Sequence, residues 1–205
     1  MELSALVSAF VTLFVIIDPV GLTPLYASLT QGQTPAGRRA IAVRSLGIAF
    51  GILVLFTLLG EAVMGFVGIT MPAFRIAGGV LLFLTALEML FEKRTKRREG
   101  QASPQELPDP SVFPLATPLL AGPGAITTVI LLAGQQDSYA GLAAIVAVEA
   151  ALLFLVFGFF LTAAPLERFA GKTGINVITR LLGMLLAALS VQFVLDGLRD
   201  FGLAG

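Results

Sequence analysis

Long apolar stretches recur along the chain, and short segments that hold most of the charged residues separate them. A helix needs about 20 largely apolar residues to cross the hydrocarbon core of a bilayer, so this pattern predicts membrane-spanning helices. We expect six spans, at residues 3–29, 40–60, 72–91, 112–134, 140–163 and 174–195.

The composition agrees with a chain that lies mostly in lipid. Hydrophobic residues make up 57% of the 205 positions and charged residues only 13%, with a mean hydropathy of +0.93; soluble domains carry about 25% charged residues. The sequence therefore predicts an all-α integral membrane protein. It contains neither Cys nor His, which excludes disulfides and thiol chemistry and removes the usual metal ligand and general base. We expect no enzyme activity, no metal and no cofactor.

The basic residues are distributed unevenly between the two ends of the predicted spans. If the N-terminus lies outside, eleven of the thirteen Lys and Arg residues fall on the inner side and only Arg75 and Arg199 fall outside. The positive-inside rule then places both termini outside the cell membrane, with segment 92–110 as a cytoplasmic linker. We interpret the basic run 93–98 as a topology determinant and not as a nucleic-acid site.

A cluster of helix-breaking residues interrupts the first predicted span. Pro19 lacks a backbone donor and Gly21 loosens the chain, so the helix should break in mid-membrane and resume near Pro24. Asp18 and Thr23 would then be candidate substrate ligands, together with Pro19 and Gly21. The Asp18 carboxylate could cap the resumed helix, bind a cation, or do both.

A second cluster, with Gly122, Pro123 and Gly124, interrupts the fourth span. A helix that resumes after it presents free N–H groups and the positive end of its dipole, which suit a carboxylate. Thr127 and Thr128 would add hydroxyl groups on its first turns. The alternative is an ordinary proline kink, with the threonines bonded back to helix carbonyls.

The two halves of the chain resemble each other. Residues 75–82 align with residues 180–187, and Pro19 matches Pro123. We therefore expect a first three-helix repeat at 1–91 and a second at 111–205, with broken helices 1 and 4. Three crossings reverse the chain direction, so the second repeat would be inverted relative to the first, with a binding site near the midplane.

Two further features bear on mechanism and assembly. Glu149 is a second intramembrane acid and could couple transport to protons or other ions, as could Asp18; a structural role for Glu149 is equally open. Gly47 and Gly51 form a GxxxG pattern that favours a close helix contact, either within the subunit or in a homo-oligomer.

At these motifs the chain resembles the MarC family of six-span inner-membrane proteins, which includes small neutral amino acid transporters. Many members have Asn where this chain has Asp18. The resemblance implies a transport fold with glycine or alanine as the substrate class. It rests on residues 17–21 with Pro24, on 38–44, on 118–124, and on 174–176 leading to 180–184.

We therefore expect a secondary transporter that moves a small zwitterion by alternating access. Proton coupling is the first hypothesis; sodium coupling and uncoupled export stay open. The alternatives are an exporter or channel for another small polar metabolite, and a non-transporting membrane assembly protein.

Overall fold

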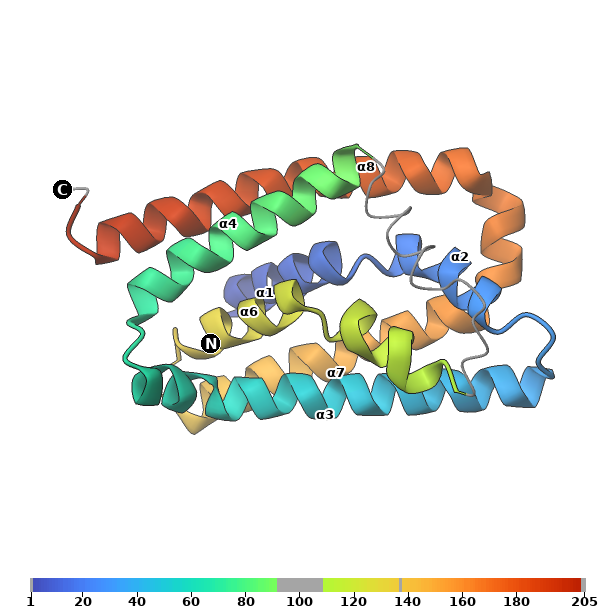
Figure 1. Cartoon of the computed structure of the whole chain (residues 1–205), viewed down its shortest axis with the longest axis horizontal. Coiled ribbons are helices and arrows are strands. Elements are labelled where there is room, and N and C mark those ends of the chain that lie inside the picture. Colours follow the sequence, from blue (N-terminus) through green and yellow to red (C-terminus); the bar gives the residue numbers. More distant parts are fainter. Residues whose placement is uncertain (1, 92–108, 137, 204–205) are drawn as a thin grey trace.

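The computed structural model describes residues 2–91, 109–136 and 138–203, and these form helices joined by short turns. The predicted linker, apart from its last residues, and the whole basic run 93–98 lie outside the described residues. Figure 1 shows the helices in chain order. They are α1 (Leu3–Ile17), α2 (Pro19–Leu29), α3 (Pro35–Val67), α4 (Met71–Leu90), η1 (Ser111–Leu120), α6 (Pro123–Ala133), α7 (Tyr139–Leu161) and α8 (Ala163–Asp200).

Four helical segments are long and apolar enough to cross a membrane: α3, α4, α7 and the Thr173–Asp200 part of α8. Two bent pairs, α1 with α2 and η1 with α6, pass the same test together, so up to six spans are present if each pair is one span. The prediction of an all-helical integral membrane protein is therefore confirmed. The helix breaks expected in the first and fourth spans are confirmed as well.

Local chemistry makes α3 longer than the expected span. The Thr34 hydroxyl accepts a hydrogen bond from the Gly37 N–H at 3.1 Å, and Pro35 occupies the first helical position, where its missing donor costs nothing. The helix then continues to Val67 and ends at Gly68 in the left-handed conformation. In α8, Gly171 interrupts the helix with a φ of +61°, a value that glycine adopts without strain.

The unbroken helices pack as two pairs, and the two bent pairs lie between them. Helix α4 packs along α8, and α3 packs along α7. Figure 1 shows these two pairs on opposite edges, with α1 and α6 between them. Helices α1 and α2 contact α7 and α8, whereas η1 contacts α3, and α6 contacts both α3 and α4. Each bent pair thus packs against unbroken helices from the other half of the chain.

Corresponding unbroken helices of the two halves run antiparallel. In α4 and α8, Gly79 lies against Ser190 while Gly197 lies against Ile76, so the residue numbers run in opposite directions. Both glycines allow close approach: an added Cβ on either would come within 2.7 Å of a neighbouring atom. Helices α3 and α7 are antiparallel too, because the start of α3 and the end of α7 line one cleft.

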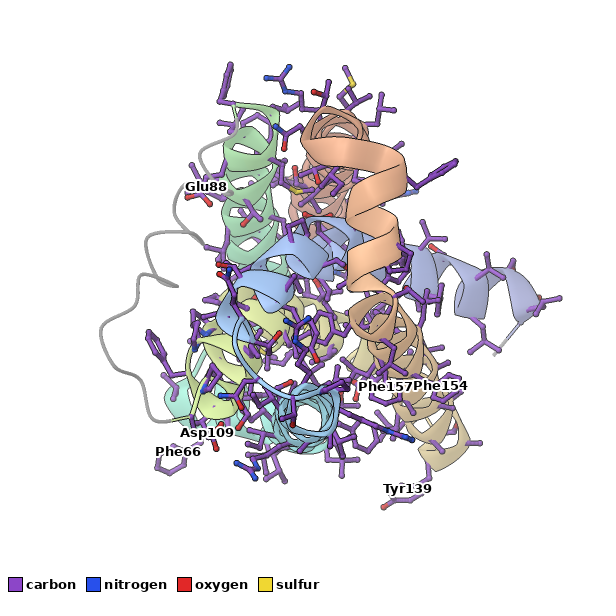
Figure 2. All side chains as sticks on the ribbon, turned by 90° about the vertical axis from the view of Figure 1, so that its right-hand side faces the viewer. Phe66, Glu88, Asp109, Tyr139, Phe154 and Phe157 are labelled. Carbon is purple, nitrogen blue, oxygen red and sulfur yellow. The ribbon has the colours of Figure 1, made fainter. Side chains whose placement is uncertain are left out.

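Many large apolar side chains are exposed on the outer surface. Phe66, Tyr139 and Phe154 are 93%, 92% and 78% exposed and point away from the bundle (Figure 2). Large exposed apolar surfaces mark contact with lipid or another protein. In an integral membrane protein, lipid acyl chains cover this surface.

Candidate functional site

The first break lies at Asp18, between α1 and α2, whose axes differ in direction by 41°. Asp18 has φ 56° and ψ 66°, the left-handed conformation that aspartate tolerates better than most residues. The helix resumes at once with Pro19, so the expectation that it resumes near Pro24 was wrong. Proline is favoured at the first helical position because no intrahelical partner exists there for an N–H group.

The Asp18 carboxylate caps the helix that it begins. The side chain is fully buried, and its Oδ1 accepts a hydrogen bond from the Gly21 N–H at 3.0 Å. A Cβ on Gly21 would lie 2.2 Å from Asp18 Oδ2, so only glycine leaves room for this carboxylate. The N–H of Gly21 is therefore already bonded within the chain.

The second break lies at Ala121 and Gly122, between η1 and α6, where the bend is 54°. Helix η1 is a π-helix whose Phe113 and Thr117 are extended, as expected for residues that precede proline. The Ala121 N–H bonds to Ala116 O at 2.9 Å. Gly122 packs so closely on the preceding turn that a Cβ there would lie 2.3 Å from Pro118 O.

The start of α6 has no capping side chain. Gly122 occupies the cap position and Pro123, the first helical residue, has no N–H. The Ile126 N–H bonds to Gly122 O at 3.0 Å, which leaves the amides of Gly124 and Ala125 without a capping acceptor. The positive end of the α6 dipole is therefore not neutralised by a cap, in contrast to that of α2.

The two breaks lie side by side. A Cβ on Gly124, in the first turn of α6, would lie 3.3 Å from Ile16 Cγ2 in the last turn of α1. Asp18 follows Ile16 by two residues, and Gly122 precedes Gly124 by two. The fold therefore brings together two helix interruptions that are separated by about half of the chain.

The threonines near the breaks differ in their hydrogen bonds. Thr23 Oγ1 donates to Pro19 O at 2.7 Å, and Thr128 Oγ1 donates to Gly124 O at 2.8 Å. Both bonds point back to the helix itself, which was the alternative interpretation of these residues. The Thr127 hydroxyl forms no hydrogen bond within the described part of the chain, and its methyl group packs against Gly78.

Glu149 lies in a separate buried pair between α7 and α3. Its side chain is 1% exposed, and Oε1 accepts a hydrogen bond from the Thr57 hydroxyl. Its Oε2 is buried and has no hydrogen-bond partner among the described residues, none of which forms an ion pair with it. Only one of the two oxygens of this carboxyl group therefore has a hydrogen-bond partner among the described residues.

Thr57 is a site residue to which the sequence analysis gave no role. It precedes Gly60 by three residues, about 4.5 Å along the helix. A Cβ on Gly60 would lie 2.5 Å from Ile130 Cγ1 of α6. The Thr57–Glu149 pair therefore lies about one helical turn from the point where α3 contacts α6. A hydroxyl group within an apolar span was the signal for Thr57 in the sequence.

No group of three or more metal-ligating side chains occurs among the described residues. The polar groups described in the interior are carboxylates, hydroxyls and helix ends. An all-helical membrane protein with two interrupted spans whose breaks adjoin is the class that the fold and site define.

The chain belongs to the MarC family of integral membrane proteins, whose family model matches residues 3–201. It is 40% identical over 198 residues to a UPF0056 membrane protein of Aquifex aeolicus, covering 95% of this chain and 92% of the relative. It is 36% identical over 203 residues to the Bacillus subtilis membrane protein YvbG, covering 97% and 96%. It is 34% identical over 200 residues to the Escherichia coli inner membrane protein YhgN, covering 96% and 98%. No solved structure matches the chain.

Proposed function

We propose that this protein is a secondary transporter of small neutral amino acids of the glycine and alanine class. The observation that carries this proposal is the adjacency of the two breaks, which sets a buried carboxylate near an uncapped helix start. Interrupted helices whose ends face one another are the usual way in which transporters build a midplane site.

The two helix starts would bind opposite ends of a zwitterion. The substrate carboxylate would meet the amides of Gly124 and Ala125, which no side chain caps. The substrate ammonium would meet the Asp18 carboxylate, which already neutralises the start of α2. The small residues around both breaks, mostly Gly, Pro and Thr, would suit a small zwitterion better than an aromatic or other bulky substrate.

Alternating access would come from a 3+3 inverted repeat. Antiparallel α3 and α7, antiparallel α4 and α8, and the packing of each bent pair on helices of the other half support such a repeat. The two halves would rock about the site at the breaks. Both termini would lie outside, because most of the basic residues would then fall on the inner side of the membrane.

Glu149 is the better candidate for ion coupling, because Asp18 is committed to capping α2. An unpaired carboxylate in the membrane interior costs several kcal/mol, so Glu149 would be protonated or hold a cation. We propose proton coupling at Glu149, with sodium bound by the same carboxyl group as the alternative.

The test is uptake of labelled glycine and alanine into liposomes that contain the purified protein. We expect saturable uptake and counterflow well above that of empty vesicles. Uptake that does not saturate would indicate a channel, and uptake of a different polar metabolite would change the substrate class. If correctly folded protein gives no more flux than empty vesicles, the transport hypothesis would be rejected and a membrane assembly role would be favoured.

A further inference from the structure

A cleft of about 390 Å³ lies at the end of the molecule where α2 ends, α3 begins and α7 ends. Figure 2 looks onto this end. Its lining combines basic, amide and apolar side chains from these three helices, from the turn that follows α2 and from the first residue of α8. They are Tyr26, Gln33, Pro35, Arg38, Arg39, Phe160, Leu161 and Ala163.

One wall of the cleft is a rigid aromatic pair. The rings of Tyr26 and Phe160 stack with centroids 4.2 Å apart and planes within 1° of parallel. The Tyr26 hydroxyl donates to the Arg38 carbonyl at 2.7 Å, which ties the end of α2 to the first turns of α3. These contacts hold the backbone of the basic residues in place without using their guanidinium groups.

The opposite side of the cleft carries two positive charges. Arg38 and Arg39 form no ion pair with another residue in the described part of the chain. Guanidinium groups and a glutamine amide are hydrogen-bond donors of the kind that bind a phosphate group. The positive charge of the cleft therefore favours an anionic ligand.

An apolar stripe leads away from the cleft along the outside of α7. Leu161 forms part of the cleft wall and is 52% exposed. Phe157 and Phe154 precede it by four and seven residues, the spacing that places side chains on one helix face. Figure 2 shows both phenylalanines beside α7. This stripe lies on a membrane-spanning helix, so it faces acyl chains.

We propose that the cleft binds one anionic phospholipid. The lipid phosphate would lie between Arg38, Arg39 and the Gln33 amide. One acyl chain would follow the stripe from Leu161 to Phe154. The continuity between a basic cleft and a lipid-facing stripe favours a lipid over a soluble phosphate compound, which would use only the charged part. This site does not depend on the proposed transport function.

The test measures binding of phosphatidylglycerol and of phosphatidylcholine to the purified protein, by native mass spectrometry and by thermal shift in detergent. The wild type should prefer phosphatidylglycerol. The double variant Arg38→Gln, Arg39→Gln should bind it roughly 30-fold more weakly, since each basic residue near the surface contributes about a factor of five. Tyr26 bonds the Arg38 carbonyl, so its hydrogen bond survives both substitutions.

Two controls make the result decisive. Arg199→Gln removes one charge at the far end of the molecule and should leave the lipid preference unchanged; Arg39→Gln alone removes one charge at the cleft and should weaken binding. Soluble glycerol phosphate should compete poorly. Equal binding of the two lipids to the wild type, or unchanged binding to the double variant, would overturn the site. Competition by glycerol phosphate as effective as by the lipid would overturn the lipid assignment.

Discussion

The two helix breaks begin in the same way and are completed differently. Both resumed helices have proline at their first position, at Pro19 and Pro123. The first break has Asp18 as its cap, with a buried carboxylate bonded to the helix start. The second has Gly122 at the equivalent place and no capping side chain. One helix start is thus neutralised by the chain itself, and the other is left open.

Under the proposed transport function, this difference would give the two halves separate tasks. A neutralised start with a buried acid suits a cation, whereas an open start suits an anion. A zwitterion that bridges the breaks would satisfy both. A perfectly symmetric pair of breaks would offer the same group twice and would not distinguish the two ends of an amino acid.

The largest expected effect comes from changing the charge of Asp18 without removing its cap. Asparagine caps a helix as well as aspartate and tolerates the left-handed conformation. Asp18→Asn should therefore keep the melting temperature near that of the wild type while glycine flux falls roughly 100-fold, as expected for the loss of a buried charge partner.

Asp18→Ala is the matched control for this prediction, because it removes both the cap and the charge. It should lower flux and also destabilise the protein by about 1 kcal/mol. Wild-type flux in Asp18→Asn would show that the carboxylate only caps α2, and the contrast between the two breaks would lose its functional meaning.

Glu149→Gln tests whether Glu149 contributes to ion coupling, separately from the capping residue Asp18. We expect glycine accumulation driven by a pH gradient to fall roughly tenfold, because a glutamine side chain cannot take up and release a proton as a carboxyl group does. Counterflow of glycine should continue. Uptake at several imposed pH gradients measures this. Glu61→Gln, an exposed acid on α3, is the control and should behave as the wild type. Normal gradient-driven accumulation in Glu149→Gln would remove Glu149 from coupling.

Thr127→Val tests the uncapped start of α6 by removing a single neutral hydroxyl group. Thr127 has an uncommitted hydroxyl, and one neutral hydrogen bond contributes about 1 kcal/mol, so KM for glycine should rise roughly fivefold. Thr128→Val removes a hydroxyl that bonds Gly124 O and should change KM little. Equal effects of the two variants on KM would argue against substrate contact by Thr127.

The smallest effect concerns the approach to the second break. Hydrogen bonds from the Ser111 hydroxyl and amide, with a smaller contribution from Arg44, hold the pKa of Asp109 below its ordinary value of 3.8. A lowered folded-state pKa stabilises the protein above the ordinary value and loses that contribution as pH falls through the lowered one. Asp109→Asn should lower the melting temperature by about 1 °C at neutral pH, since the Asp109 and Arg44 side chains are 36% and 57% exposed. The difference should vanish in acid; a constant difference at all pH values would contradict this.

The sequence predicted the membrane class, the four unbroken apolar spans and both breaks, because hydropathy and the Pro-Gly clusters are local signals. It also placed Asp18 as a cap candidate. It did not predict that Gly21 serves to make room for that carboxylate, since a close approach depends on three-dimensional placement. The Thr57–Glu149 pair joins residues 92 positions apart, and no spacing rule links them.

The absence of cysteine from the chain permits a direct test of the central claim, that the two adjoining breaks move relative to each other around the solute. The measurement is glycine flux through the double variant Ile16→Cys, Gly124→Cys, before oxidation, after oxidation and after reduction. The account predicts that oxidation joins the two positions and stops flux, and that reduction restores it. A disulfide that forms and leaves flux unchanged would contradict the claim, as would failure of the two positions to join.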